Sequence, residues 1–142
     1  MAHQLADRHG PSAPTTGTCL QTWPPDPLTE IRDEPAPRLI VDAPIPEQLA
    51  QGRVVIRYCT QHIWILPVFG AGALTVSPRL GHLHITVDDG PYRWVDASGQ
   101  PLIVNKLPPG PHRILIELVD PTHRTLAREV VSFTIPTPVP AR

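Results

Sequence analysis

Hydrophobic and polar residues alternate with a period of two along much of the chain behind residue 37, as they do in half-buried β-strands. In residues 82–88, the odd-numbered positions are apolar and the even-numbered positions are polar, so the two sets face opposite ways. The predicted strands are Arg38–Asp42, Arg53–Cys59, His82–Asp88, Tyr92–Val95, Pro101–Val104, His112–Val119 and Glu129–Ile135. About seven short strands with frequent turns and no convincing helix predict an all-β, immunoglobulin-like antiparallel sandwich, with a closed barrel as the alternative.

Proline marks the two ends of this predicted domain. The chain has 20 prolines among 142 residues, about three times the usual proportion of roughly 5%, which excludes a helical bundle and suits turns and extended segments. Residues 1–37 are proline-rich without any hydrophobic period, so we expect a largely disordered arm there. The sandwich domain is then expected over residues 38–136, and a short flexible tail over residues 137–142.

Charge and hydropathy exclude several classes of partner. The formal net charge of -1 gives no general attraction to nucleic acid or to an acidic membrane surface. No segment approaches the roughly 18 apolar residues of a membrane span, and the first thirty residues lack a secretory signal, so a cytoplasmic location is the default expectation. Two cysteines, Cys19 and Cys59, are expected to be free thiols.

Seven histidines are many for a chain of this length, and the predicted topology brings several together. If 53–59, 82–88 and 112–119 are the second, third and sixth strands, the third and sixth pair antiparallel, so the start of one lies beside the end of the other. Residues near that end of the sandwich are His82 and His84 at the start of the third strand, His123 and Asp120 after the sixth, and His62 after the second.

The pair His82 and His84 projects two imidazoles from one face of a strand, a common way to present neutral nitrogen ligands to a divalent transition metal such as zinc or copper. A third ligand from a neighbouring loop would complete the site, with His123 the first choice and His62 the second. The plainer alternative is a polar outer face with two unconnected histidines. The sequence therefore offers a metal site as a hypothesis.

For the other candidate residues, a structural role is an alternative to a functional one. His112 lies at the opposite end, near Asp88, and is expected to donate to backbone at a proline corner. Trp64 and Trp94 could form a platform for a ligand or could be buried aromatic core. Asp120 joins them as a candidate pocket residue through its place beside the predicted histidine group.

The runs "GHLHITVDD" and "LPPGPHRILIELVDPTH" resemble those of a small bacterial domain-of-unknown-function family with a Gly-His-x-His strand and a Pro-Gly-x-His corner. The corner is also similar to the one that leads into the sixth strand of many bacterial immunoglobulin-like domains. The resemblance implies the fold and implies export for many relatives, whereas this sequence shows no signal. The matching positions are Gly81, His82, His84, Pro109, Gly110, His112 and His123.

Three functions remain open at this point. The first is a binding module for a metal ion or small molecule, built on the histidine group. The second is a small enzyme, with a histidine acid or base in a pocket covered by residues 60–81, although no known catalytic motif supports it. The third is a structural or interaction protein that forms homo-oligomers through strand edges or the proline-rich arm.

Overall fold

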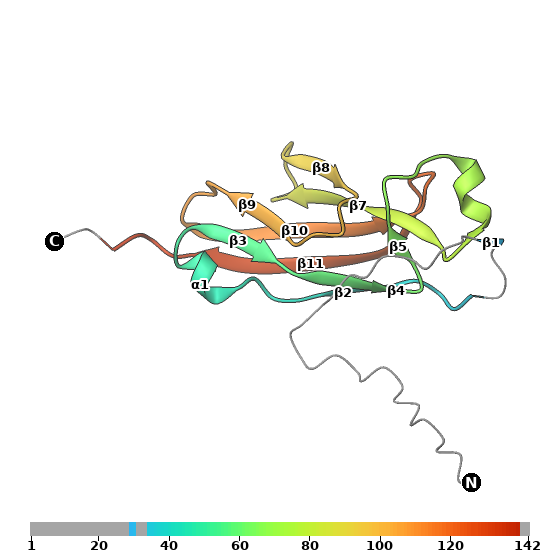
Figure 1. The fold of residues 1–142 in the computed structure, drawn as a ribbon. Helices are drawn as coiled ribbons and strands as arrows, with labels where there is room; N and C mark the ends of the chain where they lie inside the picture. Colours follow the sequence, from blue (N-terminus) through green and yellow to red (C-terminus); the bar gives the residue numbers. More distant parts are fainter. Residues whose placement is uncertain (1–28, 31–33, 140–142) are drawn as a thin grey trace, which may run out of the picture.

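The computed structural model describes residues 29–30 and 34–139, which form two packed layers of β-strands (Figure 1). The all-β sandwich expected from the alternating pattern is confirmed. The elements are β1 Thr29–Glu30, β2 Arg38–Val41, α1 Pro46–Leu49, β3 Arg53–Ile56, β4 Tyr58–Gln61, β5 Trp64–Ile65, β6 Val76–Ser77, β7 Leu80–Val87, β8 Arg93–Asp96, β9 Leu102–Asn105, β10 Gly110–Val119 and β11 Thr125–Ile135.

The larger layer is a five-stranded sheet in the order β11-β10-β7-β5, with β8 also paired to β7. The antiparallel pairing expected between the third and sixth predicted strands is present as β7 with β10. Its register sets Val119 opposite His82 and Glu117 opposite His84. The end of β10, and the turn that follows it, therefore lie beside the start of β7.

The second layer consists of two strand pairs, β2 with β4 and β3 with β9. Alternate residues of both layers meet in one apolar core, so the odd-numbered residues of β7 are buried there and its even-numbered residues lie on the outer face. The fully buried members from β7 and β10 are Leu83, Ile85, Ile114, Ile116 and Leu118. From β3 and β9 they are Val54, Ile56, Leu102 and Val104.

The structure differs from the predicted elements in three details. The predicted strand over 53–59 is interrupted at Arg57, because β3 pairs with β9 while β4 turns to pair with β2. A four-residue helix, α1, and a 3-10 turn over Ala71–Thr75 occur where no helix was expected. The short strand β5 pairs with β7 in parallel, so the sheet is not wholly antiparallel.

Residues ahead of the predicted domain also contact it. Strand β1 pairs with β6, and the Glu34 carboxylate accepts hydrogen bonds from the Ser77 hydroxyl and from the backbone N–H of Arg79. The structured part therefore begins before the boundary expected at residue 38. The remaining residues of the predicted arm, 1–28 and 31–33, and Cys19 among them, lie outside the described residues. The thiol of Cys59 is free.

Within 29–30 and 34–139, the structure has no helix that is both long enough and apolar enough to cross a bilayer.

Candidate metal centre

Two of the predicted ligands, His82 and His84, lie on the outer face of β7, the face directed away from the core. An outer face is normally exposed to solvent, but His82 is 0% exposed. The ring of Phe69, from the loop between β5 and β6, packs edge-on against the His82 ring with centroids 4.8 Å apart. The loop therefore covers the start of β7 and buries one imidazole beneath an otherwise exposed phenyl ring.

His123 reaches the same place from the turn between β10 and β11. The buried Asp120 organises this turn, since its Oδ1 accepts hydrogen bonds from the Thr122 and Arg124 backbone N–H groups and from the Thr122 hydroxyl. The backbone N–H of His123 donates to the carbonyl of Asp120 at 2.9 Å. These bonds hold His123 at a φ of 70°, a left-handed backbone conformation that residues other than glycine rarely adopt.

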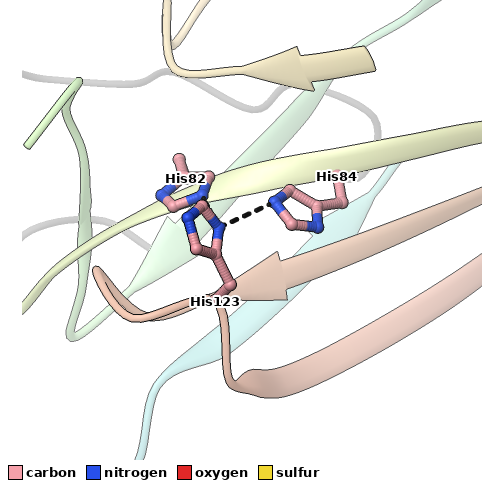
Figure 2. A group of neighbouring side chains, drawn as sticks. All are labelled: His82, His84 and His123. Carbon is pink, nitrogen blue, oxygen red and sulfur yellow. Dashed lines mark hydrogen bonds between the residues drawn. The ribbon is translucent and has the colours of Figure 1, made fainter. Parts of the chain in front are cut away.

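The three imidazoles converge on one point (Figure 2). Nδ1 of His123 lies 3.1 Å from Nε2 of His82 and 3.2 Å from Nε2 of His84. One ring nitrogen from each histidine lies within 4.8 Å of the other two. Residues from β7 and from the turn 39 to 41 positions later in the chain thus form a single nitrogen cluster.

Gly81 permits the close approach that this arrangement needs. A Cβ at this position would lie 2.6 Å from the Val119 carbonyl oxygen and 2.7 Å from the Ile63 side chain. Any larger residue would push β10 away from β7 next to the point where Val119 pairs with His82. The glycine therefore keeps the His123 turn close to the two histidines of β7.

Burial and the neighbouring imidazoles favour the neutral forms of His82 and His84. Burial first, and then the His84 and His123 rings, lower the pKa of His82 to about 4, while the Asp120 carboxylate opposes the shift. Burial and His123 also lower the pKa of His84, against a raising effect of Glu117. Neutral imidazoles carry the free lone pairs that metal coordination requires.

The nitrogen spacing fits a small transition metal ion. Bonds of 2.0–2.1 Å in a tetrahedral arrangement would separate ligand nitrogens by about 3.3–3.4 Å, close to the 3.1 and 3.2 Å between Nδ1 of His123 and the other two nitrogens, which lie within 4.8 Å of each other. Three imidazoles suit zinc or copper, whereas calcium and magnesium need oxygen ligands. Within the described part of the chain, this is the one group of histidine, cysteine or acidic side chains with metal-ligand spacing.

The remaining predicted residues of this end do not join the ligand set. His62 is exposed, on the turn between β4 and β5 with a φ of 61°, and is not a member of the cluster. Trp64 is half-buried on β5, where its backbone N–H donates to the Arg79 carbonyl. Asp120 is not a ligand, and its hydrogen bonds shape the turn that carries His123.

Trp94, on β8, pairs with the buried Ile85 and packs partly against the core, so its ring lies on the core side of the sheet. The neighbouring Val95 pairs with His84 and helps to line a groove of about 360 Å³ on the outer face. The Trp94 ring also lies against Tyr92, with centroids 5.3 Å apart.

A separate pocket of about 390 Å³ does lie under residues 60–81, between Leu74 and Arg79 of that segment and Thr122 of the turn that carries His123, but no histidine lines it.

His112, at the opposite end, is the corner residue that the sequence predicted. Its Nε2 donates to the Pro108 carbonyl at 2.6 Å and its Nδ1 donates to Asp88 Oδ2 at 2.7 Å. The hydrogen bond to Asp88 raises the pKa of His112 despite partial burial, with a further contribution from Pro108. Its ring also stacks on Phe133.

Sequence reasoning missed two contributors to the site. Phe69 carries no signal, because its segment has no period and the contact with His82 joins residues from different elements. Gly81 is part of the Gly-His-x-His pattern, yet only the contact with the Val119 carbonyl explains it.

A family model described as a family of unknown function (DUF6130) matches residues 6–141. This chain belongs to that family. Neither the curated proteins nor the solved structures that were compared with this DUF6130 chain include a match. The family has no assigned activity, so the chemistry of the histidine cluster is the basis for a function.

Proposed function

We propose that this DUF6130 domain is a metal-binding module whose three histidines, His82, His84 and His123, hold one divalent transition metal ion, zinc or copper. The observation that carries the proposal is the convergence of three ring nitrogens within 4.8 Å of one another. Three protein ligands leave a coordination position of a tetrahedral ion open, as in zinc sites that bind exchangeable ligands.

The state of the imidazoles supports this proposal over a structural role. Three imidazole rings that face one another cannot all be satisfied by mutual hydrogen bonds, because Nδ1 of His123 offers either one proton or one lone pair to its two neighbours. The second nitrogen of His82, Nδ1, is buried without a hydrogen-bond partner. A cation that accepts one lone pair from each ring resolves the conflict at the centre of the cluster.

The test is isothermal titration calorimetry of untagged full-length protein, with Zn²⁺ and separately with Cu²⁺. We expect one tight site per chain. The variants His84→Ala and His123→Ala are expected to lose about 100-fold or more in affinity, since each removes one of three ligands. Both side chains reach the surface of the sandwich, so their replacement leaves the core intact.

His62→Ala is the matched control, because it removes an exposed histidine from the same end of the sandwich but outside the cluster. It should bind metal like the unaltered protein. Equal loss of affinity in His62→Ala and His84→Ala, or an affinity no tighter than that of a surface histidine tag, would contradict the proposal.

A further inference from the structure

The groove beside His84 lies on the outer face of the sheet, between β8 and β10. Its volume of about 360 Å³ is in the lower part of the range for small-molecule pockets, roughly 300–1,000 Å³. Its outer-face lining includes Val95, which pairs with His84 and supplies an apolar surface, and the charged residues Arg93 and Glu117. Trp94, in contrast, pairs with the buried Ile85 on the core side. Phe69 contacts His82 and His123 instead, so the aromatic cover and the groove approach the cluster through different histidines.

The two charged residues of the groove, Glu117 and Arg93, are in different situations. Glu117 has compensating partners, since its Oε2 accepts from the Thr125 hydroxyl at 3.2 Å and lies 3.6 Å from the Arg128 guanidinium. Arg93 is exposed, and its guanidinium has no acidic partner among residues 29–30 and 34–139. The groove therefore offers one uncompensated positive charge.

The register of β7 and β8 sets Arg93 at a fixed distance from the metal ligands. Arg93 faces Thr86, and Val95 faces His84. Thr86 and His84 lie two residues apart on the same face of β7, so Arg93 starts about 7 Å farther along the sheet than His84. An anionic group held by Arg93 and a second group on the metal would lie at opposite ends of the apolar surface.

Resting on the proposed metal centre, we infer that this groove binds a small dicarboxylate that completes the coordination of the metal. One carboxylate displaces water from the open position beside His84. The carbon chain lies against Val95, and the second carboxylate pairs with the guanidinium of Arg93, whose planar fork matches a carboxylate in two parallel hydrogen bonds. Specificity for the second charge then comes from Arg93, while the metal provides binding common to all carboxylates.

The experiment uses the full chain loaded with Co²⁺, whose visible spectrum reports exchange of the fourth ligand. Glutarate and butyrate are titrated separately, because they share an aliphatic chain and a first carboxylate but only glutarate has the second. We expect glutarate to bind about tenfold more tightly, as is typical for a charge-assisted hydrogen bond to arginine. Arg93→Gln should remove that advantage and leave butyrate binding and Co²⁺ affinity unchanged.

Arg53→Gln is the control, because Arg53 is an exposed arginine of β3 in the other layer and should keep the tenfold preference. Equal affinity for glutarate and butyrate, or a preference that survives Arg93→Gln, overturns the inference while the metal centre stands. Spectra that do not change with either carboxylate also overturn it. Failure of the chain to bind Co²⁺, Zn²⁺ and Cu²⁺ overturns the metal centre and the dicarboxylate site together.

Discussion

The two ends of the larger sheet use histidine in opposite ways. At one end, His112 has two acceptors, the Pro108 carbonyl and the Asp88 carboxylate. Both hydrogen bonds require a proton on the ring nitrogen, so these partners favour the charged form of the imidazole and raise its pKa. At the other end, His82, His84 and His123 have mainly one another as partners, and burial lowers the pKa of His82 and of His84.

The comparison shows that the partners of an imidazole, rather than its position in a strand or turn, indicate its role. A carbonyl and a carboxylate satisfy both nitrogens of His112 and leave none for a ligand. The facing nitrogens of His82, His84 and His123 cannot all be satisfied in this way, and a metal ion would supply the missing partner. Each of the following predictions concerns a change at one end of the sheet that is expected to leave the histidine contacts of the other end unchanged.

The largest expected effect is metal-linked stabilisation of the folded state. Zinc at 1,000 times its dissociation constant should raise the free energy of unfolding by about 4 kcal/mol, because the unfolded chain lacks the site. His84→Ala, with an affinity about 100-fold lower, should reduce this increment to about 1.4 kcal/mol or less at the same zinc concentration. His112→Ala should lower the stability of the metal-free protein but keep the full increment, since its ring lies at the other end of β10.

Urea unfolding monitored by circular dichroism, with and without zinc, measures both quantities. An increment that His112→Ala reduces as much as His84→Ala does would show that the two ends are not separate.

The second effect concerns Asp120, whose carboxylate holds the His123 turn. Asp120→Ala removes three hydrogen bonds to Oδ1, which together contribute about 3 kcal/mol at roughly 1 kcal/mol each. It should also weaken zinc binding, because His123 loses its left-handed conformation. Asp120→Asn keeps an acceptor oxygen and should retain most of both properties. Calorimetric zinc affinity in the two variants distinguishes a loss of the turn from a loss of charge.

Gly81→Ala should have a somewhat smaller effect, about 2 kcal/mol of destabilisation, since overpacking against backbone forces the strands apart. Zinc affinity should fall with it, because Val119 and the following turn move away from His82. Gly72→Ala is the matched control, as a Cβ there meets nothing within 4 Å. Equal shifts of the urea midpoint in both variants would contradict the role of Gly81 in the close approach of β10 to β7.

The sequence predicted the fold and most of the site, because both depend on local alternation and simple pairing rules. The period of two in 82–88 set His82 and His84 on one face, and antiparallel pairing of that strand with 112–119 placed His123 beside them. His112 followed from the proline corner, and its predicted contact with backbone is present.

The parts that could not be predicted depend on contacts between distant segments. Nothing in the sequence places Phe69 over His82, because the loop from 66 to 75 has no regular pattern. His62 was expected near the cluster since it follows a strand that ends there, yet its side chain takes no part. The end of a strand fixes where a residue lies, but the turn geometry decides where its ring points.

The smallest effect is a difference in how the two ends respond to pH in metal-free protein. Because the folded pKa of His82 is lowered from 6.5 to about 4, the unfolded chain binds more protons in that interval, and this histidine lowers stability as the pH falls through it. The pKa of His112 is raised above 6.5, so its stabilisation is full below 6.5 and is lost as the pH rises through the folded value. The two contributions therefore have opposite signs in different pH windows.

Unfolding of His112→Asn and of the unaltered protein, compared at about pH 5.5 and about pH 8.5, isolates the second contribution. Burial raises the pKa of Asp88, but the hydrogen bonds from His112 and from the Arg113 backbone N–H outweigh it, and the net pKa lies below 3.8. Asp88 is therefore ionised at both pH values, so within the His112–Asp88 pair only His112 titrates, and contributions from other groups cancel when the variant is compared with the unaltered protein. The variant should be less stable by up to about 1 kcal/mol at the lower pH, and the gap should narrow at the higher pH. A gap that is equal at both pH values would mean that the partners of His112 do not favour its charged form, and the contrast with the histidine cluster would then rest on geometry alone.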